Sequence, residues 1–173
     1  NTCYMNSIIQ CLVHTLPLSY FFIKQKFKPF IKNNKDNPKY ELFILKNWFD
    51  LTNAIWNNNC VLSPTSFFKC IQAVSQALKR TEFLGHGQKD AEEFLVYLID
   101  SMHTAISRKV IFNIMGNVEN KIDEMAIESS KSWKTHFENS YSYFIDLFYG
   151  QYHTSLTCNE CKFVKRVYEP YLI

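Results

Sequence analysis

The spacing of apolar residues changes once along this chain, and that change restricts the fold more than any other feature of the sequence. Before about residue 145, apolar residues recur every three or four positions, as on one face of a helix. Residues 90–105 are the clearest case, with Phe94, Leu95, Leu98, Ile99 and Met102. From Ile145 onward, aromatic and β-branched residues form short alternations typical of strands. We therefore expect an α+β fold, with a helical lobe over residues 1–144 and antiparallel strands over residues 145–173.

The same spacing predicts further helices over residues 3–15, 18–26, 40–56, 64–78 and 133–143. Thr2 and Ser63 are residue types that cap helices, so we expect them to precede the first and the fourth of these. Pro64 at the first helical position strengthens the second signal. Residues 116–132 are polar and mixed, and we expect an insertion or a flexible stretch there.

The composition fits one globular domain and argues against several functional classes. Hydrophobic residues make up 47% of the 173 residues, which is ample for a core. The net charge is only +3 and the lysines are scattered, so we expect no nucleic-acid partner. The chain has neither an apolar run of roughly 18 residues nor a signal-peptide pattern, so we expect no membrane partner and an intracellular monomer. The six cysteines are too few and too unevenly placed for a disulfide framework, which favours a reducing compartment.

Cys3 has the local surroundings of a reactive thiol. It falls in the first turn of a predicted helix, where backbone N–H groups are unpaired and the helix dipole is positive. Both features favour the thiolate, which is the nucleophilic form of cysteine. A lone cysteine is more often a small buried apolar residue, and the local pattern leaves that alternative open.

The residues around Cys3 carry a resemblance to a known family. Residues 1–12 read Asn-Thr-Cys-Tyr-Met-Asn-Ser-Ile-Ile-Gln-Cys-Leu. This run resembles, nearly letter for letter, the cysteine box of the ubiquitin-specific proteases, papain-like enzymes that cut ubiquitin from its conjugates. The resemblance implies that Cys3 is the nucleophile. It also implies a partial papain-like cysteine peptidase fold, in which a mostly helical thumb lobe precedes the first strands of the zinc-bearing fingers.

A second run, over residues 87–95, reads Gly-Gln-Lys-Asp-Ala-Glu-Glu-Phe-Leu. By itself it describes a glycine loop followed by the acidic start of a helix. It is also similar to the second signature of the same family, a Gln-x-Asp-x-x-Glu-Phe-Leu box. That resemblance implies that Gln88 and Asp90 bind the basic, extended tail of ubiquitin, and charge-assisted hydrogen bonds to arginine suit that task.

A third feature is the Cys158-x-x-Cys161 pair between the two predicted strands. Such a pair is half of a zinc site, although a redox pair or two buried thiols would fit as well. The flanking Phe148-x-Gly150 and Glu169-Pro170-Tyr171 resemble the third landmark of the family. In many members a later C-x-x-C completes a four-cysteine zinc site, so we expect this chain to supply only half of the ligands. The other cysteines, Cys11, Cys60 and Cys70, are expected in the core.

A cysteine nucleophile needs a base, and the candidates are His14, His86, His103, His136 and His153. His14 lies roughly 16 Å from Cys3 along the same helix, which is too far. His86 is the only one that geometry does not exclude. The resemblance implies a base and an Asp or Asn partner late in the domain, and an oxyanion-binding Asn before Asn1. We therefore expect a domain incomplete at both ends and inactive alone, although the backbone N–H of Cys3 could contribute to an oxyanion site.

Three functional readings remain at this point. The first is a deubiquitinating hydrolase that acts on ubiquitin or on ubiquitin-conjugated proteins. The alternative is a catalytically inactive ubiquitin-binding module that keeps Gln88 and Asp90 as a docking site. A zinc-binding adaptor built around Cys158 and Cys161 is the third.

Overall fold

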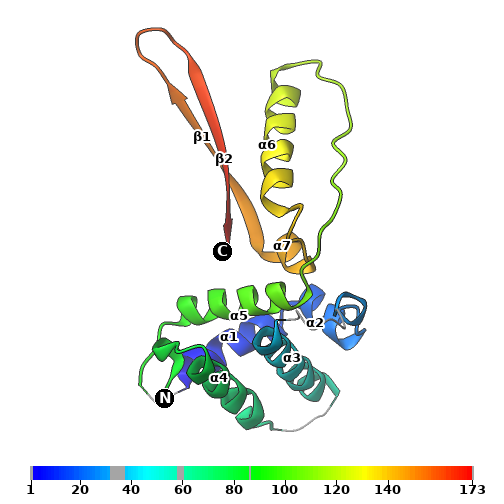
Figure 1. Ribbon diagram of the computed structural model, residues 1–173, viewed down its shortest axis with the longest axis vertical. Coiled ribbons are helices and arrows are strands. Elements are labelled where there is room, and N and C mark those ends of the chain that lie inside the picture. The colour runs from blue at the N-terminus through cyan, green and yellow to red at the C-terminus, as the bar shows by residue number, and fades with distance from the viewer. Residues whose placement is uncertain (1, 32–37, 58–60, 86, 173) are drawn as a thin grey trace. The chain divides into compact units, whose positions relative to one another are not determined.

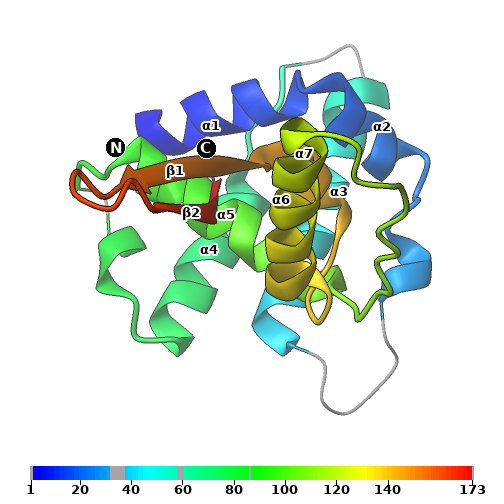
Figure 2. The same ribbon diagram turned by 90° about the horizontal axis from the view of Figure 1, so that it is seen from above.

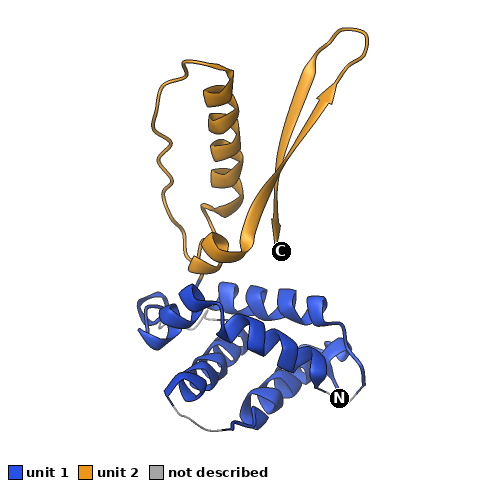
Figure 3. Cartoon of the chain, turned by 180° about the vertical axis from the view of Figure 1, so that it is seen from behind, with its two compact units in different colours: residues 1–106 blue, residues 107–173 orange. Residues whose placement is uncertain are grey.

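The computed structural model describes residues 2–31, 38–57, 61–85 and 87–172. The chain divides into two compact units, which Figure 3 shows in different colours. Unit 1 comprises Asn1–Ile106 and unit 2 comprises Ser107–Ile173. Helices dominate the described residues and the two strands come last, which confirms the predicted α+β class.

The described secondary-structure elements of unit 1 are all helices (Figure 1). Its α-helices are α1 (Cys3–Val13), α2 (Leu16–Ile23), α3 (Lys39–Asn57), α4 (Thr65–Ala77) and α5 (Ala91–Ile106), with short 3-10 turns η1 (Lys28–Phe30) and η2 (Thr81–Phe83). Helix α3 packs against α2, α4 and α5, and α1 packs against α2 and α5. Each helix thus buries one apolar face against its neighbours, as the helical spacing of the sequence requires.

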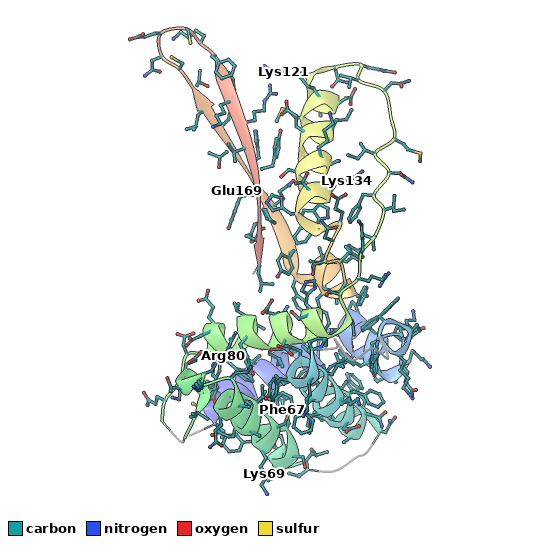
Figure 4. All side chains as sticks on the ribbon, viewed as in Figure 1. Phe67, Lys69, Arg80, Lys121, Lys134 and Glu169 are labelled. Atoms are coloured by element: carbon teal, nitrogen blue, oxygen red, sulfur yellow. The ribbon has the colours of Figure 1, made fainter. Side chains whose placement is uncertain are left out.

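Aromatic side chains form the centre of unit 1. Trp48 of α3 is fully buried, and its ring lies 5.8 Å from that of Phe67 and 6.5 Å from that of Phe22, between centroids. Phe67 projects from α4 among the helices, as Figure 4 shows. Edge-to-face arrangements of this kind add to the stability gained from burying the rings.

The predicted helices of unit 1 are confirmed with small shifts at their ends. The largest shift is at α2, which spans Leu16–Ile23 instead of the predicted residues 18–26. Helix α4 begins at Thr65 with Pro64 at the N-cap position, not at Pro64 with Ser63 as the cap. The Ser63 hydroxyl is hydrogen-bonded to the Thr65 hydroxyl at 3.0 Å instead of capping the helix. Within the described residues no single helix is long and apolar enough to cross a membrane. Helices α1 and α2 have the required length and apolarity only when they are taken together, and the pair is bent by 80°.

Unit 2 contains α6 (Lys121–Phe137), α7 (Tyr143–Phe148) and the strands β1 (Tyr149–Thr157) and β2 (Val164–Leu172). The strands pair antiparallel, from Tyr149 opposite Leu172 to Thr157 opposite Val164. Helix α6 packs against β2. The predicted hairpin is therefore confirmed, and its turn contains the cysteine pair.

The prediction of an insertion or a flexible stretch over residues 116–132 missed a helix, because α6 occupies most of this range. Asn120 caps this helix by accepting hydrogen bonds from the N–H groups of Ile122 and Asp123, while the Asp123 carboxylate accepts one from the N–H of Asn120. This reciprocal arrangement is a capping box. Only Phe137 is buried on α6, and polar residues dominate its composition, so the segment does not stand out as an apolar helix.

The change from helix to strand comes four residues later than predicted. Residues 145–148 belong to α7, which Ser142 caps by accepting a hydrogen bond from the N–H of Phe144 at 3.2 Å. The aromatic residues of this segment have high strand propensity. The Ser142 cap nevertheless starts a helix, and burial of Phe144 and Ile145 stabilises that helix.

Candidate active site

Cys3 is exposed at the first position of α1. It lines a cleft of about 510 Å³ to which α1 contributes Met5, Asn6 and Ile9, and the start of α4 contributes Pro64, Thr65 and Phe68. A carbonyl group that entered this cleft would reach the sulfur, whereas a core cysteine would be covered by side chains. The reading of Cys3 as a buried packing residue is therefore wrong.

The first turn of α1 gives the Cys3 thiol the environment expected from the sequence. The ladder of helix hydrogen bonds begins where the Asn6 N–H donates to the Thr2 carbonyl at 2.9 Å, so Cys3 stands at the positive end of the helix dipole. Thr2 occupies the predicted N-cap position, but its hydroxyl makes no capping hydrogen bond. Its ψ angle of 15° departs from the extended backbone that aims a cap hydroxyl at the first turn.

The starts of α1 and α5 lie together at one end of unit 1 (Figures 1 and 2). Tyr4, which directly follows Cys3, meets Phe94 of α5 edge to face, with ring centroids 5.4 Å apart. Both rings are buried. Because Phe94 lies only one helical turn after Asp90, this contact brings Cys3 and the Gln88/Asp90 box to the same region of the molecule.

Asp90 is the N-cap of α5, and its Oδ1 accepts a hydrogen bond from the N–H of Glu93 at 2.9 Å. The capping bond fixes the carboxylate at the start of the helix. Gln88 and Asp90 are both exposed, so either side chain can receive a ligand from solvent.

Cys158 and Cys161 lie in the turn between β1 and β2, and both are exposed. Hydrogen bonds from the backbone N–H groups of Cys161 and Glu160 lower the pKa of the Cys158 thiol. Lys162 turns the chain with a left-handed φ of 59°, and its N–H donates to the Cys158 carbonyl at 3.0 Å. Among the described residues no cluster of three potential metal ligands occurs.

Comparison with known proteins identifies the family. The family described as Ubiquitin carboxyl-terminal hydrolase matches residues 1–168. The chain belongs to the ubiquitin carboxyl-terminal hydrolase family. It is 31% identical over 175 residues to Ubiquitin carboxyl-terminal hydrolase 2 of Bos taurus, covering 99% of this chain and 27% of that protein. It is 28% identical over 175 residues to Ubiquitin carboxyl-terminal hydrolase 15 of Xenopus tropicalis, covering 99% of this chain and 17% of the relative.

A yeast member of the hydrolase family gives a similar result. The chain is 30% identical over 185 residues to Ubiquitin carboxyl-terminal hydrolase 12 of Saccharomyces cerevisiae, covering 99% of this chain and 14% of the relative. The chain therefore spans between 14% and 27% of the length of these three relatives. The family match confirms the resemblance that the cysteine box and the Gln-x-Asp box suggested.

A hydrolase with a cysteine nucleophile needs a base beside the thiol. In unit 1, His14 follows the last residue of α1, and its ring is hydrogen-bonded to the Gln10 carbonyl at 2.7 Å. His103 lies in the last turn of α5, where burial lowers its pKa. These two histidines therefore lie at the ends of α1 and α5 opposite to Cys3. His86, the histidine that sequence geometry did not exclude, lies outside the described residues.

The remaining cysteines differ in burial. Cys70 is buried, which raises the pKa of its thiol to about 12 and agrees with a core role. Cys11 is exposed on α1, so the prediction of a core residue is wrong there. Cys11 follows Ile8 by three positions, but the buried stripe of α1 passes through Ile9, Leu12 and Val13 instead. Cys60 lies outside the described residues.

Sequence reasoning missed the pairing of Tyr4 with Phe94. The sequence contained a hint of this contact. Tyr4 lies in the cysteine box and Phe94 in the Gln-x-Asp box, and both are large aromatic residues near the start of a helix. Only the packing of α1 on α5 brings the two rings into contact.

Proposed function

We propose that this chain carries the nucleophile of a thiol-dependent hydrolase that cleaves the peptide or isopeptide bond after the ubiquitin C-terminus. The observation that carries the proposal is the exposed Cys3 at the start of α1, next to the start of α5, through the contact of Tyr4 with Phe94. The names of the relatives, all ubiquitin carboxyl-terminal hydrolases, support the substrate class.

In the proposed reaction the Cys3 thiolate attacks the carbonyl carbon of the last ubiquitin residue. The bond to the leaving amine breaks as that amine takes up a proton, and a thioester joins Cys3 to ubiquitin. Water then hydrolyses the thioester and releases the carboxylate of ubiquitin and the thiol. The positive end of α1 favours the attacking thiolate.

Proton transfer in these steps requires a base, which the resemblance implies to be a histidine with an Asp or Asn partner. We assign that role to residues outside this chain, as the resemblance implies, and His14 and His103 lie at the ends of their helices away from Cys3. Residues 1–173 alone are then expected not to turn over substrate.

Gln88 and Asp90 are proposed to bind the basic tail of ubiquitin. Asp90 uses Oδ1 to cap α5, and its second oxygen would accept a hydrogen bond from an arginine of the tail. The Gln88 amide would bind the extended backbone of the same tail. A tail bound there would lead the scissile carbonyl toward Cys3.

The reading as a catalytically inactive ubiquitin-binding module rests on the same box without the chemistry. It is compatible with the positions of His14 and His103, which lie away from the start of α1. Turnover separates the two readings, because a binding module would hold ubiquitin without releasing product.

The test is to treat the full-length protein with ubiquitin bearing a C-terminal electrophile and to locate the adduct by mass spectrometry. We expect one adduct, on Cys3, and none in Cys3→Ser. Cys11→Ser is the matched control, because Cys11 is exposed on the same helix and should not affect labelling. An adduct on another cysteine, or none at all, would contradict the assignment.

We also propose that Cys158 and Cys161 supply two of the four thiolates of a structural zinc site. The lowered pKa of Cys158 suits a metal-bound thiolate, and a metal would tie the turn between β1 and β2 to whatever supplies the other ligands. Metal analysis of the full-length protein should find zinc in the native protein and a loss of it in the double variant Cys158→Ser/Cys161→Ser. Equal zinc content in both would exclude the site.

A further inference from the structure

Gln72 of α4 holds the chain segment that leads to the Gln88/Asp90 box. Its side-chain Nε2 donates a hydrogen bond to the Phe83 carbonyl at 2.5 Å, and its Oε1 accepts one from the Gly85 N–H at 3.0 Å. One side-chain amide therefore satisfies a backbone acceptor and a backbone donor on either side of Leu84. The two partners also fix the orientation of the amide, because a flipped amide would oppose donor to donor and acceptor to acceptor.

The same segment is anchored to α5 by Phe83, which is buried. Its ring stacks on Tyr97 with centroids 4.8 Å apart and meets Phe94 at 5.7 Å. Arg80, labelled in Figure 4, lies with its guanidinium 5.1 Å from the centre of the Tyr97 ring. The segment is thus held by ring packing on α5 and by the Gln72 amide on α4.

Gly85 is the last residue that the Gln72 amide holds, and its backbone conformation depends on glycine. Its φ of +75° lies in the left-handed region, which side chains with a Cβ rarely adopt. Gln88 follows three residues later, a span of at most roughly 10 Å of extended chain. Asp90, two residues after Gln88, is fixed as the cap of α5. Gln88 therefore lies between two anchored points, and Gln72 provides the first of them.

We propose that Gln72 is a positioning residue for substrate docking, which holds the segment between α4 and α5 so that Gln88 meets the ubiquitin tail. The role needs a donor and an acceptor on one side chain, which glutamine has and which alanine, methionine and glutamate lack. This inference rests on the proposed function of the Gln88/Asp90 box. It adds a residue of α4 that contacts neither Cys3 nor the box directly.

The test compares Gln72→Ala with Gln76→Ala in the full-length protein. Gln76 is exposed one turn later on α4 and is the matched control for loss of a glutamine from this helix. Labelling of Cys3 by the ubiquitin electrophile should fall roughly tenfold in Gln72→Ala, since about two hydrogen bonds are lost, and should not change in Gln76→Ala. Alkylation of Cys3 by iodoacetamide should be equal in both variants, because a small reagent does not use the box. Equal labelling of the two variants by the ubiquitin electrophile would overturn the proposal.

Two further measurements keep the result interpretable. Hydrogen exchange at the Gly85 amide should speed up in Gln72→Ala but not in Gln76→Ala. Unchanged exchange would refute the proposal that the Gln72 amide holds this segment, whatever the effect on labelling. In a double-mutant cycle, Gln72→Ala should have little further effect on labelling once Gln88→Ala is present. Additive losses would show that Gln72 does not act through Gln88.

The outcomes separate this inference from the proposed function. If the unaltered protein takes no adduct at Cys3, the hydrolase assignment fails and the substrate role of Gln72 fails with it. If the unaltered protein is labelled and Gln72→Ala is labelled at the same rate, only the positioning role is wrong. Should Gln72→Ala fold poorly, Gly85→Ala strains the same segment without touching α4, and it should lower ubiquitin-dependent labelling in the same way.

Discussion

Different kinds of interaction stabilise the interior of unit 1 and that of unit 2. Unit 1 closes around fully buried rings such as Trp48, Phe22 and Phe67. In unit 2 the long helix α6 buries only Phe137, and polar side chains join it to β2. The proposed nucleophile belongs to the unit with the fully buried aromatic core. The cysteine pair belongs to the unit in which polar side chains join α6 to β2, alongside ring contacts such as that of Phe137 with Tyr149. A site that must keep its geometry during chemistry benefits from a core that allows few alternative arrangements.

The polar contacts of unit 2 centre on Glu128 of α6. Arg166 of β2 donates from one nitrogen to both carboxylate oxygens of Glu128 at 3.2 Å, and the Tyr168 hydroxyl donates to Oε2 at 3.2 Å. The Ser132 hydroxyl donates to the Tyr168 carbonyl at 2.7 Å. Lys134, labelled in Figure 4, donates to the Phe112 carbonyl at 3.1 Å and so holds the extended segment ahead of α6. These contacts determine which face of α6 meets β2.

The largest contrast between the units should appear in thiol reactivity. In chelator-treated full-length protein at pH 7.5, iodoacetamide should modify Cys158 at least about a thousandfold faster than Cys70. Burial raises the pKa of Cys70 to about 12, which leaves little thiolate, whereas backbone N–H groups lower the pKa of exposed Cys158. Mass spectrometry measures both rates, and the unfolded protein, in which the two should react alike, is the control. Comparable rates in the folded protein would contradict the burial of Cys70.

The next largest effect is expected from removing a tryptophan ring from each unit. Trp48→Ala should lower the free energy of unfolding by about 3–5 kcal/mol, since it empties the centre of unit 1. Trp133→Ala removes a half-buried ring from α6 and should cost roughly half as much. Denaturant unfolding measures both. Equal losses would remove the distinction between the two cores.

A smaller effect is expected from the polar contacts of unit 2. Arg166→Met keeps most of the side-chain stem but removes the charge, and should cost about 1–2 kcal/mol, because the Arg166 side chain is only 15% exposed. Hydrogen exchange of the β2 amides should then speed up. Lys165→Met is the control, since Lys165 is exposed on the adjacent position of the same strand. If both variants behave alike, the Glu128 contacts do not hold the hairpin.

The smallest effect concerns pH and His103. Burial lowers the pKa of His103, with Asp100 opposing it, so the unfolded chain binds a proton at higher pH than the folded chain does. Stability should be unaffected by this group above about pH 6.5 and should fall below it by at most about 1.4 kcal/mol per pH unit. His103→Gln should flatten that dependence. Thermal unfolding of this variant and of the unaltered protein between pH 5 and 8 tests this, and identical profiles for the two proteins would reject it.

Helices rich in buried apolar residues were predictable, whereas α6 and α7 were not. Helix α5 extends from Ala91 to Ile106, within a residue of its predicted ends, because its spacing of buried residues is regular. Helix α6 is stabilised at its start by the capping box of Asn120 and Asp123, a four-residue signal that its polar composition masks. Helix α7 depends on burial of Phe144 and Ile145, which residue type alone does not reveal.

The sequence by itself determined the family, the position of Cys3 at the start of a helix and the alternation of residues in the hairpin, because each of these is a local pattern. Only the tertiary structure decided that α1 and α5 begin side by side, that Cys11 is exposed, and that Gln72 binds the backbone on both sides of Leu84. These features depend on contacts between residues far apart in the chain. Such contacts form only when the helices pack, and no spacing within a single segment encodes them.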